Sequence, residues 1–159
     1  MGKKGFDENL IVQIAIAVTN IEEVAKKLAD VFQVEVPKIY DGEELGNQEI
    51  YKGKPSKYYT KTCYFNMGQL DIELIQPTAD INESRTAAAD FLKDNGGNGI
   101  QHISFNVTNI DERVSYLQEK GLELIQRTEV PKSNIRAAFL KFNEIGAYIE
   151  LLEGCTKPQ

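Results

Sequence analysis

A short sequence occurs twice in this chain, and the repeat limits the folds that the chain can adopt. The residues Val-Thr-Asn-Ile stand at 18–21 and again at 107–110. In both places a stretch of alternating apolar residues precedes them, at 11–18 and at 100–107, and apolar residues at helical spacing follow them. Alternation favours a half-buried strand, and the helical spacing favours an amphipathic helix. The chain is therefore predicted to contain two related units that each begin with a strand and a helix.

The two units also end alike. Residues 70–75 match 147–152, and both segments alternate in the manner of a strand. The separation between matching residues falls from 89 to 77 along the chain, so the first unit holds about a dozen additional residues. These must lie within 33–62, which is long for a plain connection. Between the units, 84–94 has the composition of a short helix and ends at a glycine-rich segment.

These segments predict an α+β fold built from two tandem βαβββ modules in a single domain. The modules are 10–77 and 100–153, and a linker helix lies within 78–99. We expect the strands to form a curved mixed sheet, shaped like a cup, with helices on its outer face. Asn20 and Asn109 stand where the N-caps of the two module helices are expected.

Side chains alternate across a strand, so each strand can be divided between the two faces of the sheet. In the first strand, Val12 and the alternate apolar residues after it are expected to face the helix. The polar residues that the same count places on the opposite, inner face include Gln13, Glu73, His102, Ser104, Asn106, Tyr148 and Glu150.

Four of these residues form an equivalent pair in each module, namely Gln13 with Glu73 and His102 with Glu150. Carboxylates among apolar neighbours are unfavourable unless a positive charge compensates them. A divalent cation such as zinc, nickel, cobalt or manganese would do so, with imidazole nitrogen and amide oxygen as further ligands. We therefore predict that these four residues bind one divalent metal ion, with affinity falling as the pH drops below about 6.5. The alternative is a half-solvated groove with an incidental histidine.

Composition excludes several other classes of function. The chain has 24 acidic and 18 basic residues and a formal charge of -6, which disfavours nucleic acid as a partner. No apolar run is long enough for a membrane span, and a cytoplasmic protein is expected. The single histidine excludes sites that need two imidazoles from one chain. Cys63 and Cys155 are far apart and are expected to be unpaired thiols.

The duplicated pattern resembles the vicinal oxygen chelate superfamily, which includes glyoxalase I, methylmalonyl-CoA epimerase, extradiol dioxygenases and bleomycin-resistance proteins. The resemblance covers roughly 10–153, and its most specific part, 91–107, is similar to the segment that enters the second module of methylmalonyl-CoA epimerases. It implies the metal ligands Gln13, Glu73, His102 and Glu150. This set of Gln, Glu, His and Glu is similar to that of some glyoxalase I enzymes, whereas epimerases more often carry His first.

The resemblance implies an enzyme that moves a proton next to a carbonyl group through a metal-chelated enolate. A methylmalonyl-CoA epimerase-like isomerase is the first reading, and a glyoxalase I-like lactoylglutathione lyase is the alternative. The substrate would be a small acyl thioester or a hemithioacetal, the protein a homodimer, and Glu150, with Glu73 opposite, the catalytic base. We predict Ser104, Asn106 and Tyr148 as substrate contacts. A metal-free drug-binding protein is a further alternative, and the single histidine disfavours an extradiol dioxygenase.

Two features of the long segment 33–62 remain open at this stage. Epimerase-like chemistry implies an additional glutamate that is not a ligand, and Glu43, Glu44 and Glu49 are candidates, unless they form a solvated acidic loop. The cations and aromatic residues at 51–59 are consistent with a clamp for coenzyme A phosphates or a lid, and equally with a plain surface loop.

Overall fold

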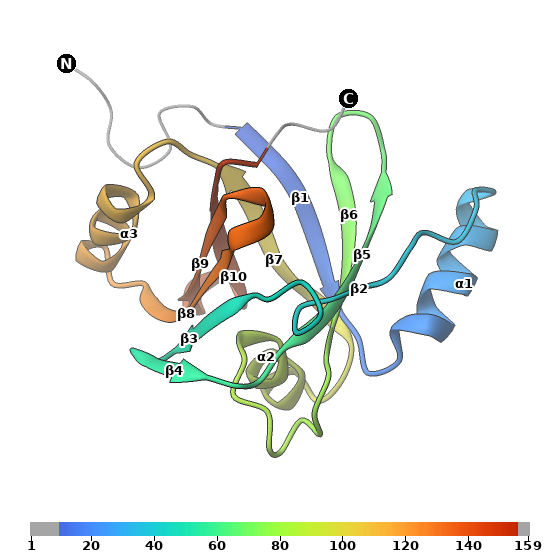
Figure 1. Cartoon of the computed structure of the whole chain (residues 1–159), viewed down its shortest axis with the longest axis horizontal. Helices are drawn as coiled ribbons and strands as arrows, with labels where there is room; N and C mark the ends of the chain where they lie inside the picture. Colours follow the sequence, from blue (N-terminus) through green and yellow to red (C-terminus); the bar gives the residue numbers. More distant parts are fainter. Residues whose placement is uncertain (1–9, 156–159) are drawn as a thin grey trace.

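The first strands of the two repeats pair with each other at the middle of one large sheet. In the computed structural model, which describes residues 10–155, β1 (Leu10–Ala17) lies antiparallel to β7 (Gly99–Asn106). The described residues form a mixed ten-stranded sheet in the order β2-β5-β6-β1-β7-β10-β9-β8-β3-β4. This sheet is strongly curved, and its two halves face each other across a central space (Figure 1). The α+β fold and the curved sheet predicted from the repeat are confirmed.

Each module places its helix on the outer face of its own half. The first contains α1 (Ile21–Phe32), β5 (Thr60–Asn66) and β6 (Asp71–Pro77). The second contains α3 (Ile110–Glu119), β8 (Glu123–Val130), β9 (Ile135–Phe142) and β10 (Ala147–Glu153). In both, the last strand runs parallel to the first, β6 beside β1 and β10 beside β7. The helices α1 and α3 lie at opposite sides of the molecule (Figure 1).

The repeat extends to the contacts that hold these helices. Gln76 Oε1 accepts the Ile21 N–H at 2.7 Å, and Glu153 Oε1 accepts the Ile110 N–H at 3.0 Å. Asn20 caps α1 as predicted, because its side chain accepts a backbone hydrogen bond at the first turn. Asn109 occupies the N-cap position of α3 as predicted, but it does not cap the helix with its side chain. Its backbone is left-handed, with φ 47°, and its side chain makes no capping hydrogen bond, since the end of β10 supplies the acceptor instead.

The additional residues of the first module reach across to the second. After the two-residue strand β2 (Tyr40–Asp41), the strands β3 (Gln48–Tyr51) and β4 (Lys54–Ser56) form a hairpin. Strand β3 pairs with β8 of the second module and not with its own module. The insertion therefore extends the far half of the sheet and places its side chains opposite those of the first half.

The helix between the modules closes one end of the curved sheet. Helix α2 (Ala87–Asn95) begins after the N-cap Thr86 and lies below the sheet, between its two halves (Figure 1). Its residues pack in one apolar cluster with Phe139 and Tyr148 of the second module. The linker helix is thus also the floor of the central space.

Two β-bulges interrupt the central pairing at equivalent places. The register passes from Ile11 to Gln13 in β1, which skips Val12, and from Ile100 to His102 in β7, which skips Gln101. A bulge places two residues of one strand opposite one of its partner, so alternation fails there. Val12 accordingly packs in the inner cluster with Phe139 and Tyr148, and not in the clusters of α1 or α3. For this reason Val12 does not face the helix of its own module as predicted, and the helical residues in its cluster belong to α2.

Two smaller expectations can also be compared with the described residues. Cys63 and Cys155 are free thiols, as predicted. Within 10–155, no helix combines the length and the apolar character needed to cross a membrane.

Candidate metal centre

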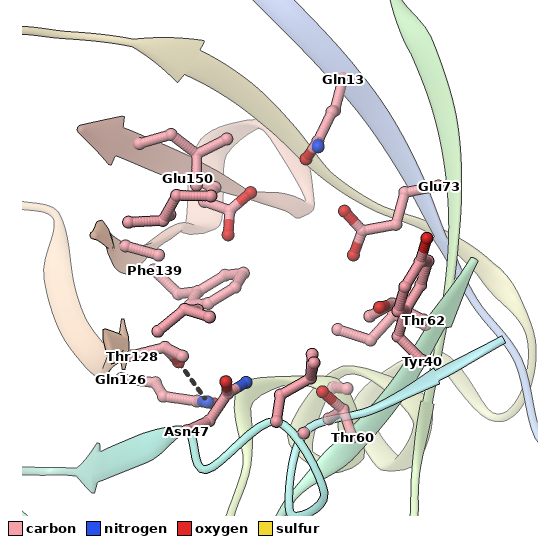
Figure 2. Close-up of a pocket in the computed structure, with 18 of the residues that line it drawn as sticks. Gln13, Tyr40, Asn47, Thr60, Thr62, Glu73, Gln126, Thr128, Phe139 and Glu150 are labelled. Carbon is pink, nitrogen blue, oxygen red and sulfur yellow. Dashed lines mark hydrogen bonds between the residues drawn. The ribbon is translucent and has the colours of Figure 1, made fainter. Parts of the chain in front are cut away.

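A cavity of about 440 Å³ occupies the space between the two halves of the sheet. Its wall includes side chains from both modules, from the inserted hairpin and from α2 (Figure 2). Among the described residues that line it, Lys132 is the only one with a cationic side chain. Three lining residues carry carboxylates, namely Glu49, Glu73 and Glu150. The cavity is therefore a site where buried negative charge is concentrated.

Three of the four predicted ligands come together at the edge of this cavity, where Glu73 and Glu150 line the wall and His102 is fully buried beside them. Ligand atoms of Glu73, His102 and Glu150 all lie within 4.8 Å of one another, and the three residues are buried. His102 Nε2 lies 3.3 Å from Glu150 Oε1 and 3.9 Å from Glu73 Oε2. We call this group the acid–histidine cluster.

Strand pairing explains how these residues meet. Across the sheet, Glu73 of β6, Ala15 of β1 and His102 of β7 stand in one row. The small side chain of Ala15 leaves room between the imidazole and the Glu73 carboxylate. In the next row, Gln13 of β1 and Glu150 of β10 flank Ser104 of β7.

Gln13, the fourth predicted ligand, joins the cluster through Ser104. The Ser104 hydroxyl lies 3.2 Å from Gln13 Oε1 and 2.5 Å from Glu150 Oε1. Because a hydroxyl has one proton, it donates to one of these acceptors at a time. The side chains of Gln13, Glu73 and Glu150 point into the same part of the cavity (Figure 2).

The protonation of the cluster reflects burial and like charges. Burial alone would lower the pKa of His102, but the negative charges of Glu150 and Glu73 outweigh it and raise this pKa. Burial also raises the pKa of Glu73 above its ordinary value, although the charge of His102 opposes the change. Without another cation, protons are therefore held at this cluster to a higher pH than in free side chains.

The donor set fits a divalent cation. His102 Nε2 is buried between two carboxylates and has no partner with hydrogen-bond geometry among the described residues. Its other nitrogen, Nδ1, lies 2.9 Å from Gln101 Oε1. The Phe139 ring makes a T-shaped contact with the imidazole, with 5.2 Å between the ring centroids. Two carboxylates directed at one buried ring nitrogen are unfavourable unless a proton or a metal ion lies among them. The buried Glu73, His102 and Glu150 could hold such an ion.

A second polar group faces the same cavity from the inserted hairpin. Glu49 of β3 is only 8% exposed, and its Oε2 accepts hydrogen bonds from Gln126 Nε2 at 2.7 Å and Thr128 Oγ1 at 2.6 Å. Gln126 Oε1 in turn accepts the Ala87 N–H at the start of α2. Burial raises the pKa of Glu49 to about 7, against the effect of the two hydrogen bonds. We call Glu49, Gln126 and Thr128 the Glu49 cluster.

The structure separates the three glutamates that the sequence left equivalent. Glu43 and Glu44 are exposed in the loop before the hairpin, whereas Glu49 lines the cavity. In that loop, Lys132 Nζ contacts Glu44 O at 3.4 Å. Lys132 itself and Leu45, which follows Glu44, both line the cavity.

Other predicted residues lie beside the cavity without lining it. Ser104 contacts Gln13 and Glu150, Asn106 stands at the end of β7 opposite Leu152, and neither is part of the cavity wall. Tyr148 is buried in the inner apolar cluster. Their role as substrate contacts stays a prediction. Of the segment 51–59, the exposed Lys52 lies over the ring of Tyr51, outside the cavity wall.

Several cavity residues were missed by the sequence reasoning. Gln126, Thr128, Phe139 and Tyr64 line the cavity. Gln126 and Thr128 share one face of a strand by simple alternation, which was a usable signal. What the alternation did not reveal was the buried Glu49 that they contact, because that residue comes from the other module.

Comparison with known proteins agrees with this geometry. Residues 12–139 match the family described as Glyoxalase/Bleomycin resistance protein/Dioxygenase superfamily. The chain belongs to this superfamily, as its resemblance implied.

Solved structures share the fold over nearly the whole chain. A hypothetical protein, BH1468 from Bacillus halodurans C-125, is 25% identical with a TM-score of 0.64, covering 94% of this chain and 96% of that one. Methylmalonyl-CoA epimerase from Mycobacterium tuberculosis is 20% identical with a TM-score of 0.61, covering 92% and 88%. A variant of the Streptomyces coelicolor epimerase in complex with 2-nitronate-propionyl-CoA is 20% identical with a TM-score of 0.63, covering 94% and 96%.

A curated relative matches a smaller region. The uncharacterized protein slr0090 of Synechocystis sp. is 31% identical over 71 residues, which is 45% of this chain and 20% of that protein. This chain thus aligns with only a fifth of that relative's length.

Replacing the single histidine tests the centre directly. We expect the wild-type protein to bind about one divalent ion per chain and His102→Ala to lose it, because the substitution removes the only nitrogen ligand of the cluster. Metal content after dialysis, measured by mass spectrometry of the elements, checks this outcome. Thr60→Ala, which changes another cavity residue, is the control and should retain the ion. Full occupancy in His102→Ala would contradict the assignment.

Metal affinity should depend on pH over a higher range than an ordinary histidine would give. The raised pKa values of His102 and Glu73 mean that protons compete with the ion to above pH 6.5. We expect affinity to rise between pH 6 and pH 8, by about tenfold per pH unit for each displaced proton. Titration with a competing chromophoric chelator measures it. A constant affinity across this range would contradict ligation by these two side chains.

Proposed function

We propose that this protein is a metal-dependent isomerase or epimerase that transfers a proton at the carbon next to a carbonyl group. The observation that carries the proposal is the presence, in one cavity, of a cluster able to hold a divalent ion and of a separate buried carboxylate. Glu73, His102 and Glu150, with Gln13 beside them, would hold the ion. When bound, the ion would supply positive charge that stabilises an enolate oxygen.

The two carboxylate groups differ in a way that suits acid–base work. Glu49 has a pKa of about 7, so near neutral pH it is able both to accept and to release a proton. Its Oε2 is held by Gln126 and Thr128, which fixes the direction of the carboxylate. Glu150 also lines the cavity, from β10 on the same half of the sheet as the β3–β8 pair, with its Oε1 near Ser104. Epimerisation requires one group to remove the proton and another to return it, and Glu49 and Glu150 are our candidates.

The structural neighbours support an acyl thioester as the first substrate class. They include methylmalonyl-CoA epimerases in complex with 2-nitronate-propionyl-CoA and with methylmalonyl-CoA. By this likeness, we propose an acyl thioester that presents its carbonyl group to the cavity. The first candidate activity is therefore of the methylmalonyl-CoA epimerase type.

The charge of the site favours a second candidate, a lactoylglutathione lyase of the glyoxalase I type. Glu73 and Glu150 together balance a divalent ion, Gln13 is neutral, and Glu49 adds a further ionisable carboxylate. Among the described lining residues, Lys132 alone is cationic, and it contacts the Glu44 carbonyl. A substrate without a carboxylate at the reacting carbon, such as a hemithioacetal, meets less repulsion here than a malonyl group.

A metal-free binding protein of the same fold agrees less well with these residues. Such a cleft has no need for two buried carboxylates around a buried imidazole, an arrangement that is unfavourable without a cation. A homodimeric assembly and a cytoplasmic location stay predictions.

An exchange assay in deuterated water tests the function and separates the two substrates. We expect the metal-loaded protein to incorporate solvent deuterium into either methylmalonyl-CoA or the hemithioacetal of methylglyoxal and glutathione. The reason is that the enolate carbon takes up deuterium from a carboxyl group whose proton has exchanged with the solvent. Mass spectrometry of the recovered compounds measures incorporation. The protein treated with chelator is the control and should be inactive. Absence of exchange with both compounds would contradict the proposal in this form.

Substitution of Glu49 tests the second carboxylate. Glu49→Gln keeps the size of the side chain but cannot carry a proton, so we expect the exchange rate to fall by about 10²- to 10⁴-fold with metal content unchanged. The same assay, with metal analysis of each sample, measures both quantities. Glu44→Gln changes an exposed glutamate of the same segment and should behave as wild type. Equal rates in the two variants would remove Glu49 from the mechanism.

A further inference from the structure

The residue before His102 lies on the cavity side of β7 although strand alternation assigns it to the other side. Gln101 is the residue that the β7 bulge skips, because Ala15 pairs with His102 and Ile16 pairs with Ile100. Its side chain is fully buried and forms part of the cavity wall. The bulge therefore brings two consecutive polar side chains, Gln101 and His102, to the same region.

The Gln101 amide makes one side-chain contact of consequence. Its Oε1 lies 2.9 Å from His102 Nδ1, and its Nε2 is buried without a hydrogen-bond partner among the described residues. The contact with the imidazole is thus what orients the amide. A buried amide with half of its capacity unused is a poor choice for packing alone. Its position is explained by what it does to His102.

Comparison of the two modules supports this reading. The equivalent bulge of β1 contains Val12, and the ligand candidate after it is Gln13. An amide ligand has no tautomers to select, and there the bulge residue is apolar. Where the ligand candidate is a histidine, the bulge residue is an amide whose oxygen faces the ring. The amide at the bulge therefore occurs only in the module whose ligand candidate is a histidine.

We propose that Gln101 is a positioning residue, which holds His102 with its proton on Nδ1 and its lone pair on Nε2 directed at Glu73 and Glu150. In a histidine, the hydrogen bond made by one ring nitrogen determines which nitrogen remains free to bind a metal. The Gln101 carbonyl oxygen accepts only from a protonated Nδ1. This inference rests on the metal centre of the proposed function and assigns its orientation to a residue outside the ligand set.

The single histidine of the chain makes the test direct. Protein without a purification tag, labelled with ¹⁵N in histidine, gives the imidazole signals of His102 alone. With Zn²⁺ bound, the wild-type spectrum should show a protonated Nδ1 and a metal-bound Nε2. Zinc affinity, measured by competition with a chelator, should fall about 10- to 100-fold in Gln101→Leu. Gln101→Glu keeps an acceptor for Nδ1–H and should bind zinc at least as tightly as wild type.

A matched control separates positioning from general loss of stability. Gln76→Leu removes another strand glutamine, which accepts the Ile21 N–H on the outer side, and should leave zinc affinity unchanged. The inference is overturned if Gln101→Leu binds zinc as wild type does, or if Gln101→Glu loses affinity to the same extent. A wild-type protein that binds no zinc refutes the metal centre itself. The spectrum of the metal-free protein, at a pH where the ring is neutral, then decides the Gln101 contact separately, since a proton on Nε2 would refute it.

Discussion

The antiparallel pairing of β1 with β7 is the contact on which the rest of the molecule depends. It joins the two repeats by their first strands and so sets Gln13 opposite Ser104 and Ala15 opposite His102. Since β6 and β10 run parallel to these strands, the same pairing determines where Glu73 and Glu150 arrive. A change of register by one residue would send each of these side chains to the other face of the sheet. The cluster thus exists only because two half-sites share one ladder.

Burial of like charge is the main cost of this arrangement. Glu49, Glu73 and Glu150 are all buried in one cavity, and burial raises the pKa of Glu49 and of Glu73. The two clusters reduce this cost by different means. Glu49 receives hydrogen bonds from Gln126 and Thr128, whereas Glu73 and Glu150 surround an imidazole whose Nε2 lacks hydrogen-bond geometry. The first cluster is complete within the protein, and the second fits a cation.

Sequence reasoning succeeded where strands follow regular alternation and went wrong where they do not. The inner positions of Glu73 and Glu150 follow from alternation in β6 and β10, which pair without interruption. Alternation assigned Val12 and Gln101 to the wrong face of the sheet, because a bulge depends on the neighbouring strand and has no local signature in either segment. Asn109 has an N-cap sequence, yet Glu153 supplies the acceptor because β10 ends beside the first turn of α3. These errors arise from contacts between elements.

The sequence by itself determined the duplicated βαβββ plan, the residue types of the acid–histidine cluster and the place of the insertion, because periodicity and repetition are local properties. Only the tertiary structure decided that the inserted hairpin crosses to β8 and that α2 closes the cavity. It also decided that Glu49, and neither Glu43 nor Glu44, lines the cavity. The three glutamates are equivalent in a linear reading, and pairing of β3 with a strand more than seventy residues away distinguishes them. Long-range pairing assigns each side chain to a face, and no local pattern contains that information.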